Sequence, residues 1–358
     1  MFTICGKSIS VPAPFSGVAD FILDIPSDRP IRILQLSDMQ IIDASQQRFP
    51  GRLNDRENAL WQPETIPIQC TDLIRSVVAQ ADPDLIIITG DIVYGEFDDS
   101  GSSLEQFCDF MNNLGIPWAP VYGNHDNESL RGVDWQNSRL EHSPLCLFKK
   151  GNVTGNGNYS ILLTRKGIPF RALYMMDSGG CMGSFSESAR RCPGFGEDQY
   201  NWLYSSAEGM HTVSGVVVPS FICFHIPTIQ FHLAAVEKGY QTPNEWEKYV
   251  IGVTSPAKDG DFGCKREPIS CIRTPDGFVE KLNDLAVDGV FAGHCHANNT
   301  SVLWNGIRWT YGLKTGQYDY HTVGQVGGTL ITLWDKNFSV VHITTLAPIA
   351  PVPNPPRY

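Results

Sequence analysis

Apolar and polar positions along the chain follow a pattern that predicts strands and helices in alternation. The run at 85–88 is continuously apolar and rich in β-branched residues, as in a strand buried on both faces of a sheet. Further strands are predicted at 31–36 and 118–122. Between the strands, apolar residues recur at the spacing of a helix face over 70–81 and 104–114. Strand and helix in this alternation are typical of a layered α/β fold.

The second half of the chain carries weaker signals of the same kind and then changes to strands alone. Its predicted elements, in chain order, are a strand at 171–177, a helix beginning at 197, a strand at 216–225, a helix at 278–285, a strand at 290–292 and further strands at 307–311, 328–334 and 340–346.

We expect one main domain in this chain. Residues 1–30 form an irregular N-terminal extension, residues 31–347 form the α/β domain, and the Pro-rich tail at 348–358 is extended. The stretch 128–159 is rich in Gly and Asn and weakly periodic, so we interpret it as loops around an active site.

Composition and charge exclude some classes of partner. The chain has 358 residues, of which 42% are hydrophobic, and this is enough for a large core. Its net charge of −11 argues against a nucleic-acid backbone as main partner, although bound cations would still allow anionic substrates. No apolar run is long enough for a membrane span. Residues 1–12 lack the features of a secretory signal, so a cytoplasmic location is favoured.

Ten cysteines leave two interpretations open. Cys181 with Cys192, and Cys264 with Cys271, are separated by short loops and would form disulfides in an oxidising compartment. Alternatively, most cysteines are free thiols packed as small hydrophobic residues, as Cys70 in its apolar context indicates.

Several polar side chains stand at the ends of predicted strands and offer oxygen or imidazole donors without a thiolate, which suits zinc, manganese or iron. They are Asp38, Asp91, Asn124, His225, His294 and His296. A single histidine carries little weight, because most histidines bind no metal. The order of the blocks is more specific: Ser-Asp, Thr-Gly-Asp, Gly-Asn-His-Asp, an apolar strand ending in His, and Gly-His-Cys-His.

These blocks, in this order, resemble the calcineurin-like metallophosphoesterase superfamily. The resemblance implies a four-layer α/β/β/α sandwich of two mixed sheets, with a dinuclear metal site at the strand ends. It also implies the role of each residue. Asp91 would bridge both metals, Asp38 and His296 would bind the first metal, Asn124, His225 and His294 would bind the second, His125 would face the substrate, and Asp126 would orient His125.

The first block departs from the usual pattern of that superfamily. Most members have Asp-x-His, whereas this chain has Gln40 two residues after Asp38. Tyr94 lies three residues after Asp91, and this spacing resembles purple acid phosphatases, in which a tyrosinate binds ferric iron. Those enzymes have Gly in place of Gln40 and Glu in place of Asp126. The alternative is that Tyr94 only packs in its loop while Gln40 holds a water. The stretches 176–180, 224–227 and 311–312 resemble a single-domain branch of purple acid phosphatase-like proteins.

The resemblance implies a phosphatase with two metal ions, iron together with zinc, manganese or iron. Such a site makes hydroxide available to attack a phosphate monoester in line, and His125 would then stabilise the transition state or protonate the leaving oxygen. The expected substrate is a small phosphorylated molecule, with a phosphoprotein as a further possibility. Two alternatives are a phosphodiesterase acting on a cyclic nucleotide or other diester, and a binding scaffold with little turnover, which Gln40 favours.

A few other residues have weaker claims to a role at the site. Asp177 is interpreted as a carboxylate that shapes its loop. His232 and His321 would line the substrate mouth or be solvated, with solvation favoured for His321. The arginines that would grip a phosphate from the first long loop are Arg48, Arg52 and Arg56.

Overall fold

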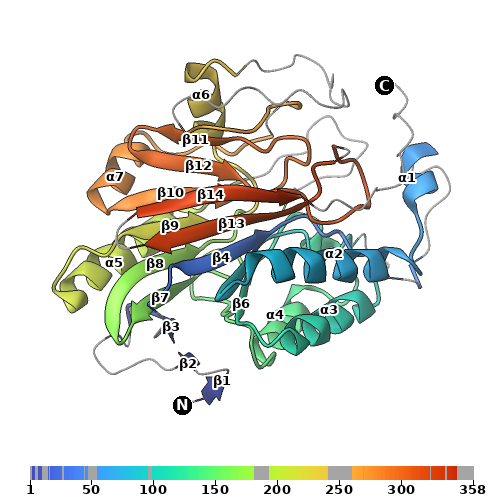
Figure 1. Ribbon diagram of the computed structural model, residues 1–358, viewed down its shortest axis with the longest axis horizontal. Coiled ribbons are helices and arrows are strands. Elements are labelled where there is room, and N and C mark those ends of the chain that lie inside the picture. The colour runs from blue at the N-terminus through green and yellow to red at the C-terminus, as the bar shows by residue number, and fades with distance from the viewer. Residues whose placement is uncertain are drawn as a thin grey trace.

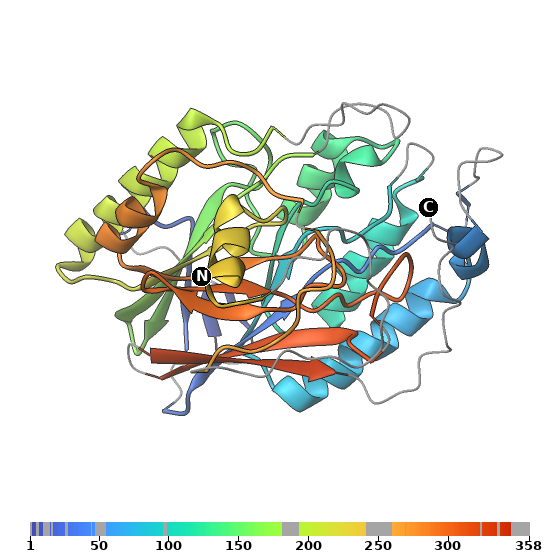
Figure 2. The same cartoon turned by 90° about the horizontal axis from the view of Figure 1, so that it is seen from above.

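The structure is a computed structural model that describes residues 2–4, 7–9, 15, 17–25, 28–43, 45–46, 55–95, 99–180, 193–240, 260–268, 270–322, 324–334 and 337–344. Two sheets form its centre, and helices lie outside them (Figures 1 and 2).

Within the described residues, one sheet has nine strands in the order β1-β2-β3-β7-β8-β9-β10-β12-β11, and the other has five in the order β14-β13-β4-β5-β6. Both sheets contain parallel and antiparallel pairs, so both are mixed. The strands are β1 (Phe2–Ile4), β2 (Lys7–Ile9), β3 (Phe21–Asp24), β4 (Ile31–Leu36), β5 (Leu85–Thr89), β6 (Trp118–Val121), β7 (Tyr159–Arg165), β8 (Ile168–Met175), β9 (Ser220–Cys223), β10 (Val287–Ala292), β11 (Ser301–Trp304), β12 (Ile307–Tyr311), β13 (Gly327–Trp334) and β14 (Asn337–Thr344).

All the helices but the first pack against a sheet or a neighbouring helix and bury residues there, whereas the first leaves its described side chains exposed or half-buried. The helices are α1 (Asp55–Leu60), α2 (Ile66–Ala81), α3 (Ser102–Asn113), α4 (Val133–Glu141), α5 (Glu197–Ser214), α6 (Ile229–Glu237) and α7 (Phe278–Asp284), with a short 3₁₀ turn at Asp126–Glu128.

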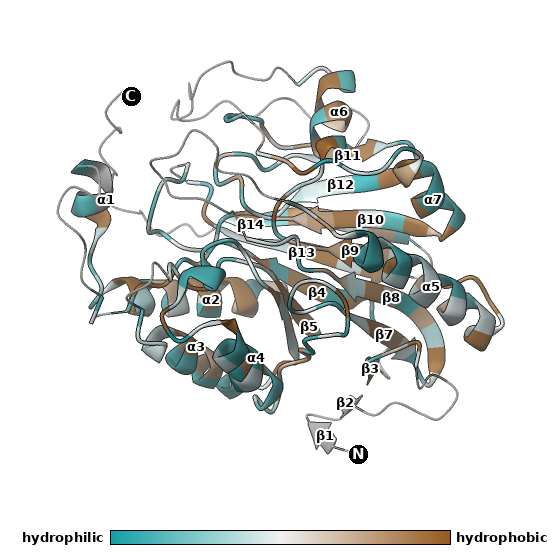
Figure 3. Cartoon of the chain, turned by 180° about the vertical axis from the view of Figure 1, so that it is seen from behind, coloured by the Kyte–Doolittle hydropathy of each residue, from teal (hydrophilic) through white to brown (hydrophobic). Residues whose placement is uncertain are grey.

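Two hydrophobic clusters hold the layers together. The first runs from α2 and α3 through the five-stranded sheet to the inner face of the nine-stranded sheet, for example from Ile74 through Ile87 to Phe291. The second lies between the nine-stranded sheet and α5, α6 and α7, and includes Leu203 and Phe231. In Figure 3 the strands are largely brown, whereas the outer helices carry teal residues. The predicted four-layer α/β/β/α sandwich is confirmed.

The strand directions place the site. In the smaller sheet β4, β5 and β6 are parallel, and in the larger sheet β9, β10 and β12 are parallel. The carboxyl ends of parallel strands meet at one edge, which is where open α/β sheets place their ligands. The loops after β4, β5, β6, β9 and β10 carry the blocks that the sequence singled out.

The sequence predicted most of these elements, but some predictions were wrong. The stretch up to residue 30 is not irregular throughout, because β3 pairs in parallel with β7. The stretch 128–159 contains α4, whose buried residues include the polar Gln136 and Asn137, so no apolar period revealed it. The strand predicted at 216–225 is shorter, because Val216 and Val217 are exposed.

Cys264 and Cys271 are free thiols, which contradicts a disulfide between them. Cys181, Cys192 and the Pro-rich tail lie outside the described residues. Within the part of the chain that the structure describes, no helix has the length and apolar character needed to cross a membrane.

Candidate metal centre

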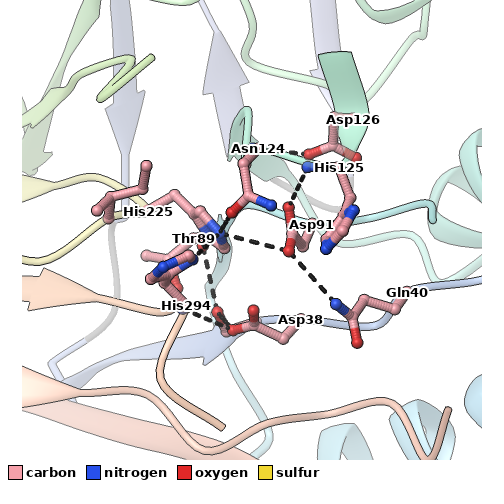
Figure 4. Close-up of polar contacts among 12 residues, drawn as sticks. Asp38, Gln40, Thr89, Asp91, Asn124, His125, Asp126, His225 and His294 are labelled. Atoms are coloured by element: carbon pink, nitrogen blue, oxygen red, sulfur yellow. Dashed lines mark hydrogen bonds and ion pairs between the residues drawn. The ribbon is translucent and has the colours of Figure 1, made fainter. Parts of the chain in front are cut away.

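The structure brings six of the predicted metal ligands together at the strand ends. Figure 4 labels five of them, and His296 joins them through its contact with Asp38. The six are Asp38 after β4, Asp91 after β5, Asn124 after β6, His225 after β9, and His294 and His296 after β10. They form two groups that share Asp91, and metal binding by these residues stays a prediction.

The backbone around these residues is shaped to turn their side chains inward. Asp38, Asp91 and His294 have φ values of 53°, 52° and 70°, a region that non-glycine residues adopt rarely and at a cost of about 1–3 kcal/mol each. Gly123 and Gly293 allow the close approach: a Cβ atom on Gly123 would lie 2.1 Å from Asp91 Oδ1, and one on Gly293 would lie 2.8 Å from Asp38 Oδ2. Both glycines are therefore required by the packing of the two carboxylates.

The first group consists of Asp38, Asp91 and His296, whose ligand atoms lie within 4.8 Å of one another. His296 Nε2 is 3.2 Å from Asp38 Oδ1. The other ring nitrogen, Nδ1, lies 2.9 Å from the carbonyl oxygen of Tyr320 and donates to it. That bond fixes the tautomer in which Nε2 carries a lone pair toward the carboxylates, as in histidines that bind metals.

The second group is centred on His225. Its Nε2 lies 3.4 Å from Asp91 Oδ2, 3.2 Å from Asn124 Oδ1 and 3.3 Å from His294 Nδ1. His225 Nδ1 donates to the carbonyl oxygen of Thr89 at 2.8 Å, so Nε2 is the nitrogen that would lose its proton to a bound metal. Without metal, burial lowers the pKa of His225, but the charges of Asp91 and Asp38 outweigh this effect and raise the pKa to about 9. Acceptor atoms of four side chains thus face one another, and a cation between them would satisfy all four.

Charge and burial support this interpretation. Burial would raise the pKa of Asp91, but His225 and His125 outweigh it and lower the pKa below its usual range. Asp38 shows the same balance: burial raises its pKa, yet the nearby His296 ring and the charge of His225 lower it to about 2. Burial and the charge of His225 lower the pKa of His294 to about 3, so this imidazole is neutral and able to bind a metal.

Among the carboxylate oxygens of Asp38 and Asp91, one is left without a hydrogen bond in the described part of the chain. Asp38 Oδ1 is buried and forms none, whereas Oδ2 accepts hydrogen bonds from Ser37 Oγ at 2.5 Å and from the His294 backbone N–H at 3.0 Å. A buried, charged oxygen without a donor is costly unless a cation fills the position. The donor set and this atom fit two metal ions.

His125 lies beside the shared carboxylate. Its backbone N–H donates to Asp91 Oδ1 at 2.9 Å, and its ring stacks on Tyr94 with centroids 4.2 Å apart. Its Nδ1 lies 2.7 Å from Glu128 Oε2. Burial lowers the pKa of His125, but the charges of Glu128 and Asp91 outweigh this effect and raise the pKa to about 9. His125 is thus protonated near neutral pH in the metal-free centre.

Glu128, rather than Asp126, contacts the His125 ring, and this corrects the expected role of Asp126. The Asp126 carboxylate accepts hydrogen bonds from the backbone N–H groups of Val93 at 3.0 Å and Gly123 at 2.7 Å. It therefore ties the loop after β5 to the loop after β6. The sequence signal for Glu128 was its position three residues after His125, one turn of a helix away.

Gln40 and Tyr94, the two positions at which the chain departs from the usual family pattern, are both buried and in contact with other side chains. Gln40 is fully buried, and its Oε1 accepts a hydrogen bond from Lys314 Nζ at 2.5 Å, a contact that the sequence did not reveal. Tyr94 is buried between His125 and Tyr318, with an edge-on centroid distance of 5.1 Å to Tyr318. Binding of a metal by Tyr94 stays a prediction.

The other residues that the sequence singled out have different outcomes in the structure. Asp177 accepts hydrogen bonds from the backbone N–H groups of Asn156 at 2.7 Å and Gly179 at 2.8 Å, which confirms its loop-shaping role. His321 is buried, so the prediction that it is solvated was wrong. His232 is a partly buried residue of α6. The predicted phosphate-gripping groups, Arg48, Arg52 and the side chain of Arg56, lie outside the described part.

Comparisons with known proteins agree with this geometry. The calcineurin-like phosphoesterase family model matches residues 31–298. An Arabidopsis thaliana protein named "Probable inactive purple acid phosphatase 14" is 26% identical, with 88% of this chain and 76% of the relative covered. "Phosphatase DCR2" of Saccharomyces cerevisiae is 26% identical, but the match covers 63% of this chain and 38% of that protein. A solved dimetal phosphatase from Danio rerio shares the fold, with a TM-score of 0.51, 13% identity, and coverage of 88% of this chain and 99% of that one.

The family match covers most of the chain, and it spans all the strand ends that carry the candidate ligands. The chain belongs to the calcineurin-like phosphoesterase family.

Proposed function

We propose that this protein hydrolyses phosphate monoesters at a two-metal centre. One observation carries the proposal: two ligand groups share the Asp91 carboxylate, and the same carboxylate accepts the backbone N–H of His125. Metal positions and a proton donor are thereby held within reach of one reacting phosphate.

Each side chain has a part in this proposal. Bound cations in such a site neutralise phosphate charge and lower the pKa of the attacking water. Asp91 sets the spacing of the two positions, and the lone pairs of His225 and His296 are aimed by their backbone partners. His125, held by Glu128, gives a proton to the leaving alkoxide, a role worth roughly 10²- to 10⁴-fold in rate.

The metals and the substrate class are part of the proposal. Carboxylate, amide and imidazole donors suit zinc, manganese and iron, and iron paired with one of these follows from the likeness to purple acid phosphatases. The substrate would be a small phosphorylated molecule, or a phosphoprotein. The negative net charge of −11 supports a mechanism in which cations, rather than basic side chains, attract the phosphate.

The test compares para-nitrophenyl phosphate with its bis ester, using protein loaded with iron, manganese or zinc. We expect faster turnover of the monoester, with a loss of about 10²- to 10⁴-fold in His125→Ala. Faster turnover of the bis ester would replace the proposal by a phosphodiesterase. Wild-type turnover in His125→Ala would remove His125 from the mechanism.

A non-catalytic binding scaffold is the second candidate. The observation that favours it is the bond from Lys314 to Gln40, which occupies the side chain found where most family members supply a ligand. One relative is itself named "probable inactive". Absence of turnover of either ester by fully metallated protein would support the scaffold.

A further inference from the structure

Gln40 is held in an orientation that prevents it from binding a metal. Lys314 Nζ can only donate hydrogen bonds, so the Gln40 atom that it contacts at 2.5 Å must be the amide oxygen. The amide nitrogen is then directed at Asp91 Oδ2, 3.5 Å away. A nitrogen that carries hydrogens has no lone pair to offer, so Gln40 presents a donor group where the first metal needs an acceptor.

Lys314 is buried next to the first metal position, which Asp38, Asp91 and His296 surround. Its side chain is 2% exposed, and Nζ also donates to the backbone carbonyl oxygen of Asp38 at 2.9 Å. It follows β12 in the chain, and its backbone carbonyl accepts the N–H of Gly327 at the start of β13, so its position is set by the fold. The amino group of a lysine is thus held against the same residue whose carboxylate would bind the first cation. Burial lowers the pKa of Lys314, and the charges of Asp38, Asp319 and Asp91 oppose this effect.

The two positions therefore differ in their donors. The second position has Asp91, Asn124, His225 and His294. The first has Asp38, Asp91 and His296 in the described part of the chain, with the Gln40 oxygen withdrawn and a positive charge nearby. Fewer donors and an adjacent cation both weaken the binding of a divalent metal.

We infer that Lys314 sets the metal affinity of the first position, so that the chain binds one divalent metal tightly at the second position and another weakly at the first. This inference rests on the proposed two-metal site. It assigns Lys314 the role of a positioning residue, which acts through Gln40 and through its own charge.

The experiment measures Mn²⁺ binding to metal-free protein by isothermal titration calorimetry. Mn²⁺ is the probe because it prefers carboxylate, carbonyl and water ligands, so Tyr94 contributes little to its binding. We expect one tight site and one weaker by about 30-fold or more. In Lys314→Met, the weak site should tighten by about tenfold or more, because the Gln40 oxygen is released and the charge is removed.

Further variants assign the sites. His296→Ala should leave the tight site unchanged, whereas His294→Ala should weaken it by about tenfold or more. Lys149→Met is the matched control, since Lys149 pairs with Asp20 at 2.6 Å and contacts none of the candidate ligands. If Lys314→Met does not fold, as judged by circular dichroism, Gln40→His carries the test, and it should tighten the weak site by adding an imidazole donor.

Two equal sites in the wild type would overturn the inference, as would an unchanged affinity ratio in Lys314→Met and Gln40→His. Equal sites with turnover of para-nitrophenyl phosphate would leave the proposed function standing. Unequal sites without turnover would support the inference and remove the proposed function. Absence of Mn²⁺ binding would remove both.

Discussion

At the scale of single residues, the centre depends on which nitrogen of each histidine is free. His225 and His296 both use Nδ1 to donate to a backbone carbonyl, so both aim Nε2 at a carboxylate. His294 instead turns Nδ1 toward His225. His125 uses Nδ1 for Glu128, a side-chain carboxylate rather than a backbone carbonyl. Small backbone contacts therefore decide whether a histidine acts as a ligand or as a proton donor.

The pairing of Glu128 with His125 predicts a shift in the pH profile. His125 acts as an acid while protonated, so activity should fall as pH rises through its pKa of about 9. Glu128→Gln removes a charge that raises this pKa, so the alkaline limb should move to lower pH by about one unit. The measurement is kcat/KM for para-nitrophenyl phosphate against pH.

The control for this profile is Glu105→Gln on the exposed face of α3, which should leave the profile unchanged. An alkaline limb at the same pH in Glu128→Gln and in the wild type would show that Glu128 does not set the charge of His125. A loss of activity without a shift would indicate a purely structural role.

Tyr94 gives a spectroscopic prediction. If Tyr94 binds ferric iron as a tyrosinate, iron-loaded protein should show a broad visible band, and Tyr94→Phe should remove it. Tyr318→Phe is a matched control, because Tyr318 is a neighbouring buried tyrosine that packs edge-on against Tyr94. A band that survives Tyr94→Phe, or colourless iron-loaded wild type, would contradict the assignment and indicate that Tyr94 only packs against His125.

At the scale of elements, the site is predictable where a strand and its ligand adjoin in sequence. Asp91 follows a strand in which all five residues are buried, so both the strand and the ligand were visible in the pattern. Glu128 and Lys314 were missed for different reasons. The Glu128 signal was a single helical turn inside a loop, whereas Lys314 contacts Gln40 across 274 positions of chain. No local pattern reports a contact of that kind.

The packing of β8 against its neighbours gives a stability prediction. Arg171 on β8 is fully buried, forms hydrogen bonds with both carboxylate oxygens of Asp288, and lies 4.2 Å from the ring centroid of Phe221. Arg171→Met leaves the Asp288 charge without this partner. Because Asp288 is partly exposed, we expect a loss of about 2–3 kcal/mol in the free energy of unfolding.

Denaturant unfolding of three variants tests this pairing. Asp288→Asn removes the negative charge that Arg171→Met would leave without an ion-pair partner. The double variant should therefore be more stable than Arg171→Met alone. Additive losses in the double variant would mean that the two residues contribute independently and that the pair is not the source of the effect.

At the scale of the whole molecule, the order of the sequence blocks predicted the layered fold and the shared site. Each block is a short contiguous segment at the end of a strand, and pairing of the strands is enough to bring these segments together. The strands before residue 31, where the domain was predicted to begin, could not be predicted in the same way. β3 carries only the short run 21–24, and it is a strand because it pairs with β7 on one side and β2 on the other. The polar burial of α4 likewise follows from tertiary contacts, such as the bond from Gln136 Nε2 to the carbonyl oxygen of Asp126 at 2.7 Å.

The contact between the two sheets should be sensitive to acid. His342 on β14 lies 2.7 Å from the carbonyl oxygen of Asn299, which precedes β11 of the other sheet, and its Nδ1 lies 2.9 Å from Thr329 Oγ1. Burial lowers the pKa of His342 to about 4. Between about pH 6.5 and 4, this imidazole is protonated in the unfolded chain but neutral in the folded chain. The free energy of unfolding therefore decreases as pH falls from about 6.5 toward 4.

We expect this residue to account for a loss of about 2–3 kcal/mol in the unfolding free energy of metal-free protein across that range. His342→Gln keeps a donor for the Asn299 carbonyl but has no group that titrates, so its stability should depend less steeply on pH. His142→Gln, at an exposed position after α4, should keep the wild-type slope. The difference between the stability curves of His342→Gln and the wild type isolates this one imidazole from the histidines of the metal centre. Parallel curves between pH 4 and 6.5 would therefore show that protonation of other groups causes the loss of stability in acid.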